Sequence, residues 1–298
     1  MLEFQKCNLC LDDSYDVLHP CTFKEDDSIG SKDLSCSNLG HGKHHRIVRC
    51  KKCGLIYSNP REKLAQIKSL YKEVKDDVYQ EAFPGRVRTF EKIFHRPEMK
   101  AAGKNLLDIG CYTGLFLKLA LKKGFTVLGV EPSYWAAQIG REKYGLKIIN
   151  ADIYEAKIDR KFDTICMWDV LEHLPDPNLA LNICHNMLSE NGILAISTMR
   201  CEGAFYSFCG RYWPWFMRMH LFYFTTNSLT AMLEKNGFKV IAVYPYTHYI
   251  SLDYLLYKAT SINKKLSIIP SNDIMKRIIF PVQMGDFMEV YAIRSTTP

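Results

Sequence analysis

The most constraining feature of the sequence is a glycine-containing turn between an apolar run and a helical pattern. Residues 105–109 read NLLDI and lead into Gly110-Cys111-Tyr112-Thr113-Gly114, after which apolar residues recur at helical spacing up to Gly124. Glycine lets the backbone turn sharply and approach a ligand closely. The N-terminus of the helix behind it offers unpaired N–H groups to an anion. The turn predicts the first strand–helix unit of a ligand-binding sheet.

Apolar runs and helical patterns alternate from residue 104 onward. Besides 105–109, runs typical of strands occupy 126–130, 147–150, 162–168, 193–198, 238–244 and 288–293. Helical patterns fill 133–144 and 176–188, and a third is expected to be capped by Thr226 and to end at Asn236-Gly237. The alternation predicts an α/β fold with a Rossmann-like, doubly wound, seven-stranded parallel sheet and helices on both faces.

The region ahead of this alternation is predicted to be a helical linker or cap over 61–100. Leu64, Ile67, Leu70, Tyr71 and Val74 recur at helical spacing, and Pro84-Gly85 and Pro97 are expected to break the region. We therefore divide the chain into residues 1–60, the helical stretch 61–100 and a main domain, 101–298. An aromatic stretch at 203–224 and an insertion at 248–283 interrupt the main domain.

The composition is that of a globular protein with one large domain and a small module. The chain has 298 residues, 47% of them apolar, which excludes wholesale disorder. No apolar run approaches the roughly 18–20 residues that span a bilayer, and MLEFQKCNLC at the start shows no apolar signal region. We expect a cytoplasmic protein whose eleven cysteines stay reduced.

Two Cys-x-x-Cys pairs in the first 60 residues predict a zinc ribbon. Cys7 and Cys10 form one pair, and Cys50 and Cys53 form the other, after a loop of 39 residues. Four thiolates suit a closed, structural, tetrahedral zinc site. The loop is long for a ribbon, so replacement of a ligand by Cys21, Cys36, His41, His44 or His45 stays open. Residues 1–60 hold eight basic and eight acidic residues, which argues against a phosphate-binding surface.

Acidic residues stand where predicted strands end. Glu131 follows 126–130, about 20 residues after the glycine turn, where a carboxylate can accept both ribose hydroxyls. Asp152 follows 147–150, where a carboxylate can accept an adenine amino group, the alternative being a plain loop or helix-cap carboxylate. Gly110, Tyr112 and Gly114 do not fit the G-x-G-x-x-G of nicotinamide-binding domains, which disfavours that structural rival.

The chain resembles the class I S-adenosylmethionine-dependent methyltransferases over residues 100–245. The resemblance is carried, in order, by LLDIGCYTGLFLKLA, GVEPS, NADI, FDTICMWDVLEHLPDP and NGILAIST. It departs from the commoner G-x-G-x-G at Tyr112. It implies S-adenosylmethionine as cofactor, with Asp108 and Gly110 near its methionine end, Glu131 on its ribose and Asp152 on its adenine. We expect the site to be completed by Tyr112 over the methionine moiety and by Gly114, Pro132, Ile153 and Trp168.

A zinc ribbon ahead of such a domain resembles a bacterial and archaeal subgroup of these methyltransferases. The junction RCKKCGLIYSNPR and the closing strand FPVQMGDFMEVYAIR carry this similarity almost to the C-terminus. Members of the subgroup commonly accompany polysaccharide, sugar-nucleotide or natural-product biosynthesis. The resemblance implies a reaction class, methyl transfer, and does not name the acceptor.

The segment Asp169-Val170-Leu171-Glu172-His173 follows the fourth strand, at the edge where open sheets bind ligands. His173 can serve as a general base, the alternative being that Glu172 and His173 only orient loops. The segment also resembles the E-x-x-E-H of ubiquinone-biosynthesis O-methyltransferases and of small-RNA 3′-end methyltransferases. That second resemblance implies a divalent metal held by Asp169, Glu172, His173 and a later histidine, for which His220 is placed. Oxygen ligands plus imidazole suit magnesium, manganese or zinc.

The two interrupting segments are candidates for contacts with the acceptor. Residues 203–224 are rich in aromatic side chains that can stack on a ring, and Arg200, Arg211 and Arg218 can bind phosphate or carboxylate. The alternative is a packed cap on the core or a dimer contact. The insertion places Leu252, Leu255, Leu256, Ala259 and Ile262 on one helical face, with Lys258, Lys264 and Lys265 nearby. This face either packs on the core or rests on a membrane near a lipid-linked substrate.

These observations favour an enzyme that transfers a methyl group to a small molecule, in the first place to an oxygen of a sugar or glycan precursor. An RNA-modifying methyltransferase is the second reading, and the neutral ribbon and modest net charge of +7 count against it. A non-catalytic cofactor-binding protein is the third, and Asp108, Glu131 and His173 count against that.

Overall fold

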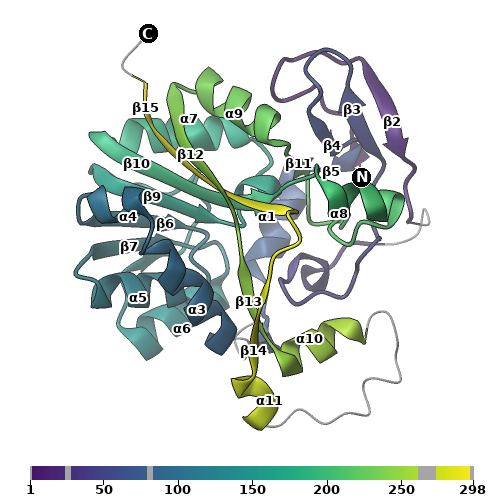
Figure 1. Cartoon of the computed structure of the whole chain (residues 1–298). Coiled ribbons are helices and arrows are strands. Elements are labelled where there is room, and N and C mark those ends of the chain that lie inside the picture. The colour runs from purple at the N-terminus through teal and green to yellow at the C-terminus, as the bar shows by residue number, and fades with distance from the viewer. Residues whose placement is uncertain (1, 24–27, 79–82, 261–272, 296–298) are drawn as a thin grey trace.

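A seven-stranded mixed sheet forms the centre of the computed structural model, which describes residues 2–23, 28–78, 83–260 and 273–295. Its order is β12-β15-β10-β9-β6-β7-β8 (Figure 1). The strands are β6 (Asn105–Ile109), β7 (Thr126–Val130), β8 (Ile148–Ile149), β9 (Phe162–Trp168), β10 (Leu188–Met199), β12 (Phe238–Pro245) and β15 (Phe287–Arg294). The predicted α/β fold and its seven strands are confirmed. The sheet is not all parallel, because β15 runs antiparallel to both β10 and β12.

Helices cover both faces of this sheet, as a doubly wound fold requires. In Figure 1, α7 (Pro177–Met187) and α9 (Thr226–Lys235) lie on one face, and α3 (Phe83–Ile93), α5 (Leu115–Lys122) and α6 (Tyr134–Tyr144) lie on the other. Side chains alternate along β9: Ile165 and Met167 join the core under α7 and α9, while Cys166 and Trp168 join the core under α3 and α5. Two buried cores therefore hold β9 in the middle of the sheet.

Helix ends follow local hydrogen bonding, with one correction to the predicted caps. Ser133 and Asp176 accept N–H groups of the first turns of α6 and α7. The cap of α9 is Thr225, one residue before the predicted Thr226, because the Thr225 hydroxyl accepts the Ser228 N–H at 3.1 Å. The Thr226 hydroxyl is instead bonded to Glu202 at 2.5 Å.

Most of the described part of 61–100 is helical, as predicted, but Pro84-Gly85 does not break a helix. The described helices are α1 (Leu64–Lys72), α3 and α4 (Pro97–Ala101). Pro84 lies in the first turn of α3, where proline needs no N–H partner. A Cβ on Gly85 would stand 2.2 Å from the carbonyl oxygen of Tyr249. Glycine therefore lets the later chain pack directly on α3.

The N-terminal segment and the aromatic stretch share one sheet. Its order is β11-β4-β3-β2, with β2 (Tyr15–His19), β3 (Ile47–Cys50), β4 (Ile56–Ser58) and β11 (Phe222–Tyr223). A second pair joins β1 (Leu2–Glu3) to β5 (Arg61–Glu62), and η1 (Ser31–Leu34) lies between β2 and β3. Within the aromatic stretch, Trp213 and Phe216 are fully buried, while Phe208 on α8 (Ala204–Cys209) is 89% exposed. Much of the stretch therefore packs as a cap on the core. The 3₁₀ helix η3 (Gly210–Tyr212) follows α8 directly.

The insertion before β15 forms an arm that projects from the domain (Figure 1). The arm consists of β13 (His248–Ser251) paired antiparallel with β14 (Ile279–Val282), and of α10 (Leu252–Ala259) and α11 (Asp273–Arg277). Ile262, Lys264 and Lys265 lie outside the described residues. Among the residues that the structure describes, none of the helices combines the length and apolarity needed to cross a membrane.

Candidate functional site

A cavity of about 1100 Å³ opens at the carboxyl ends of β6 and β9. Open α/β sheets bind ligands at this edge. One side is the β6–α5 wall, which we define as Asp108, Gly110 and Tyr112. Another part of the lining is the histidine wall, which we define as the side chains His19, His41, His44, Glu172, His173 and His220.

The β6–α5 wall has a strained turn with close backbone contacts. Gly110 has a φ of 69°, and a Cβ there would lie 2.6 Å from Cγ2 of Val170, so only glycine fits. Tyr112 also has a positive φ, 51°. Its N–H donates to Oε2 of Glu131 at 2.7 Å, and its hydroxyl donates to the Asp76 carbonyl at 2.5 Å. The turn thus leaves a concave surface beside a buried acid.

Two buried carboxyl groups border this turn. Glu131, at the end of β7, accepts the N–H groups of Tyr112 and Ser133, the latter at 2.8 Å. Burial raises the pKa of Glu131 to about 7, against the opposing effect of these two N–H groups. Burial and the charge of Glu131 raise the pKa of Asp108, which is 2% exposed. Both acids are poised to gain from donors supplied by a ligand.

The other predicted cofactor residues are placed differently. Trp168 lines the cavity, and its buried Nε1 has no hydrogen-bond partner among the described residues. Asp152 accepts the N–H groups of Tyr154 and Glu155 and lies 2.8 Å from Nζ of Lys68. These contacts match the loop-capping alternative for Asp152. The predicted residues that do not line the cavity are Gly114, Glu131, Pro132, Asp152 and Ile153.

Arg86 is a cavity residue that the sequence did not indicate. It comes from α3 and lines the cavity together with Asp108. Its positive charge lowers the pKa of Asp108 against the larger effect of burial. The only sequence signal is a basic residue just after Pro84-Gly85, in a region expected to be broken.

Glu172, His173 and His220 come together on the histidine wall. One ligand atom from each lies within 4.8 Å of the others. His173 Nδ1 is 2.9 Å from the Met219 carbonyl and His220 Nδ1 is 2.7 Å from the Trp215 carbonyl. A carbonyl only accepts, so both Nδ1 atoms carry the proton and both Nε2 atoms keep a lone pair.

Burial keeps this cluster uncharged in the absence of a ligand. It lowers the pKa of His173 and sets that of His220 well below its ordinary value. Burial and the charge of Asp169 raise the pKa of Glu172 to about 8, and Oε2 of Glu172 has no hydrogen-bond partner among the described residues. Asp169, the fourth predicted member, lines the cavity but is not in the cluster; it accepts the Ser197 hydroxyl at 2.7 Å.

The arm and the N-terminal segment meet at the cavity, where Cys36 and Lys258 both contribute to the lining. Nζ of Lys258 on α10 donates to the carbonyls of Cys36 and Asn38 at 3.3 and 3.0 Å. The Ser37 hydroxyl donates to the Asp76 carboxylate at 2.5 Å. Burial lowers the pKa of Lys258 to about 8. These contacts tie three segments that are distant in sequence over one site.

The four predicted zinc ligands also meet, away from the cavity lining. Sulfur atoms of Cys7, Cys10, Cys50 and Cys53 all lie within 4.8 Å of one another, which fits a tetrahedral metal bound by four thiolates. The N–H groups of Leu11 and Gly54 return to the carbonyls of Cys7 and Cys50, so each pair sits on the same kind of turn. The alternative ligands are outside this cluster: Cys21, Cys36, His41, His44 and His45.

Comparison with known families places the main domain. Residues 79–243, more than half of the chain, match the family described as "Methyltransferase domain". The chain belongs to the methyltransferase family. Its main domain is a class I S-adenosylmethionine-dependent methyltransferase domain, as the sequence motifs implied.

Curated relatives match part of this methyltransferase. The ubiquinone biosynthesis O-methyltransferase of Pseudomonas syringae pv. tomato is 30% identical over 114 residues, 36% of this chain and 49% of the relative. That of Pseudomonas fluorescens is 29% identical over the same length. The chain thus spans about half the length of these relatives.

Solved structures of methyltransferases are similar at lower identity. A possible histamine N-methyltransferase from Thermotoga maritima is 20% identical, with a TM-score of 0.47 and coverage of 72% of this chain and 90% of that one. Magnesium protoporphyrin IX methyltransferase from Synechocystis is 13% identical, with a TM-score of 0.46 and coverage of 78% and 92%.

Proposed function

We propose that this methyltransferase transfers the methyl group of S-adenosylmethionine to an oxygen of a small molecule. The observation that carries the proposal is the cavity itself, because it joins the β6–α5 wall to the cluster of Glu172, His173 and His220. The first wall suits a nucleoside-containing cofactor, and the second offers two imidazole lone pairs. The curated relatives are named as O-methyltransferases, which supports oxygen as the methylated atom.

Two acidic residues and one arginine hold the cofactor around the turn between β6 and α5. When bound, S-adenosylmethionine supplies an electrophilic methyl group. Glu131 accepts the ribose hydroxyls, Asp108 accepts the methionine amino group, and Arg86 pairs with the methionine carboxylate. The buried, unsatisfied state of Trp168 Nε1 and the raised pKa values of both acids support a polar occupant here.

The histidine wall prepares the acceptor hydroxyl. A neutral His173 or His220 with a free Nε2 can take the hydroxyl proton as methyl transfer begins. The same three side chains also fit a divalent metal, since one possible ligand atom from each lies within 4.8 Å of the others. Calorimetry with Mn²⁺ and Mg²⁺ decides between these roles. If neither metal binds and the protein keeps full activity in chelator, the metal role is excluded and the general-base role remains.

The acceptor class needs a direct assay. We propose a hydroxylated biosynthetic intermediate, in the first place a sugar, because aromatic Trp215, Tyr249 and Tyr254 line the cavity with polar His41 and Asp286. Purified protein is incubated with S-adenosylmethionine labelled on the methyl group and with two probes, a nucleotide-linked hexose and a catechol. Label in the hexose supports a sugar acceptor, and label in the catechol moves the proposal to phenolic acceptors. Label in neither probe contradicts both.

We further propose that Cys7, Cys10, Cys50 and Cys53 hold one structural zinc ion. A closed set of four thiolates leaves no open position for chemistry. Elemental analysis is expected to give about one zinc per chain. Absence of zinc from protein purified without chelator would contradict the assignment.

A further inference from the structure

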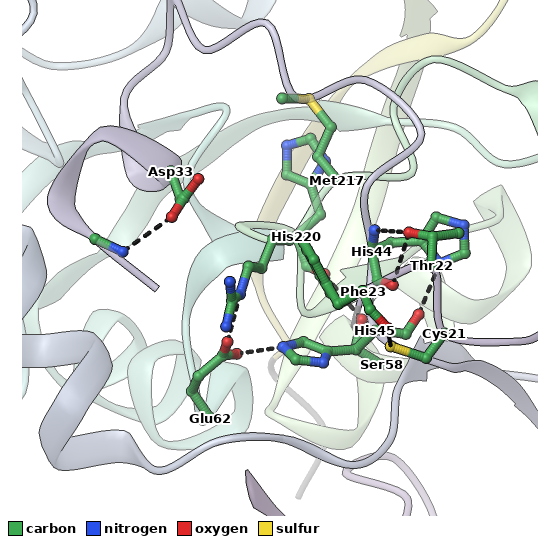
Figure 2. A network of polar contacts seen from close by, with 12 residues as sticks. Cys21, Thr22, Phe23, Asp33, His44, His45, Ser58, Glu62, Met217 and His220 are labelled. Atoms are coloured by element: carbon green, nitrogen blue, oxygen red, sulfur yellow. Dashed lines mark hydrogen bonds and ion pairs between the residues drawn. The ribbon is translucent and has the colours of Figure 1, made fainter. Parts of the chain in front are cut away.

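A buried ion-pair network joins the loop that carries His220 to the N-terminal segment (Figure 2). The Glu62 carboxylate, 3% exposed, is 2.6 Å from Nε of Arg218 and 2.7 Å from Nε2 of His45. Burial disfavours a charge on Glu62, but the hydrogen bonds and charges of His45 and Arg218 outweigh it and lower its pKa. Glu62 is therefore ionised at neutral pH. The Arg218 guanidinium also lies over the ring of Phe23, 4.4 Å from its centroid.

This network corrects the role expected for Arg218 of the aromatic stretch. Arg218 was a candidate for binding a phosphate or carboxylate of the acceptor. It is 9% exposed, it pairs with Glu62 of β5, and it does not line the cavity. Its guanidinium therefore anchors the loop to the N-terminal segment.

Residues 215–221 fix both histidine rings through their main chain. The carbonyl of Trp215 accepts a hydrogen bond from Nδ1–H of His220, and the carbonyl of Met219 accepts one from Nδ1–H of His173. Arg218 lies between these two carbonyls in the sequence. A shift of this loop would therefore release both rings, and each ring could then place its proton on Nε2, the atom that needs a lone pair.

The N-terminal segment clamps the same loop at a second point. The Ser58 hydroxyl donates to the His220 carbonyl at 3.1 Å, and the Ser58 N–H donates to the Leu221 carbonyl at 2.9 Å. The Leu221 N–H in turn donates to the Glu172 carbonyl at 2.9 Å. The loop is thus held between Ser58 and Arg218 on one side and the Glu172-His173 turn on the other.

We propose that Glu62 is a positioning residue for the histidine wall. Through Arg218 it fixes residues 215–221, and through their carbonyls it sets the tautomer of His173 and His220. The role in catalysis rests on the proposed function, whereas the control of the tautomer does not.

The test compares E62Q with E289Q. Both replace a buried carboxylate paired with arginine by an amide of the same shape; Glu289 on β15, 2% exposed, is paired with Arg96. Long-range nitrogen–proton NMR of protein labelled in its histidines reads each tautomer directly and needs no acceptor. We expect one Nδ1–H tautomer for His173 and His220 in the wild type and in E289Q. In E62Q we expect a second tautomer or exchange broadening for both rings.

Two further measurements separate positioning from a general loss of structure. The affinity for S-adenosylhomocysteine, measured by calorimetry, should stay within about twofold in E62Q. R218K, which keeps the charge but loses the planar fork, should disturb the same two signals. S58A should do so more weakly. Unchanged tautomers in E62Q, or the same disturbance in E289Q, would overturn the proposal, even if methyl transfer itself is confirmed.

Discussion

The two walls of the cavity are built in different ways. Asp108, Gly110 and Tyr112 of the β6–α5 wall come from one strand and the turn after it, and β7 beside them supplies Glu131. The histidine wall combines β2, the loop after η1, the turn after β9 and the loop before β11. The first wall depends on local backbone geometry inside the main sheet. The second depends on the position of the N-terminal segment. A change that disrupts one wall should therefore leave the other wall intact.

The largest expected effect is unfolding of the N-terminal segment when the proposed zinc site is broken. The variant C53S breaks the four-sulfur cluster, and metal binding supplies most of the folding free energy of small metal-dependent modules. We expect loss of bound zinc and of methyl transfer, while the affinity for S-adenosylhomocysteine falls less than about tenfold. Elemental analysis and calorimetry measure both. The control C21S removes an exposed thiol outside the cluster and should change neither.

The next effect isolates chemistry on the histidine wall. In H173A, turnover of whichever probe accepts the methyl group should fall roughly 10²–10⁴-fold, the range for loss of a general base. The affinity for S-adenosylhomocysteine should not change, because His173 is not part of the β6–α5 wall. H185A, on the far helix α7, serves as the control. Full turnover in H173A would remove this residue from the reaction.

A complementary effect, on cofactor affinity, is expected from a change at Glu131, beside the β6–α5 wall. In E131A, the affinity for S-adenosylhomocysteine should fall roughly 100-fold, because two hydrogen bonds from ribose hydroxyls to a charged group are lost. Calorimetry measures the affinity, and the histidine tautomers should remain those of the wild type. E142A on α6 is the control. Wild-type affinity in E131A would refute the ribose assignment.

The contrast between the walls explains what could be predicted from sequence. The strand at 105–109, the turn at Gly110 and the position of Glu131 directly after the next strand were predicted because each depends on neighbours in the chain. The four cysteines were predicted because their spacing within each pair is local. Pairing of β11 with β4, and of Arg218 with Glu62, joins residues more than 150 positions apart, and no local pattern encodes such contacts.

Two smaller errors have the same origin. Thr225 and Thr226 are equivalent as sequence signals, and a tertiary contact with Glu202 decides which one caps α9. Pro84-Gly85 predicts a break by local rules, yet the pair starts α3 because Tyr249 of the arm packs against Gly85.

The smallest expected effect is a dependence of cofactor affinity on pH. Burial raises the pKa of Glu131 to about 7, so in the free protein its carboxyl group is protonated below this pH and ionised above it. Only the ionised form accepts hydrogen bonds from both ribose hydroxyls. Affinity for S-adenosylhomocysteine should therefore rise a few-fold between about pH 6 and pH 8, with net release of protons on binding below the pKa. Calorimetry in buffers of different ionisation enthalpy measures both quantities. In E131Q the pH dependence should vanish, and a slope that persists in E131Q would assign it to another group.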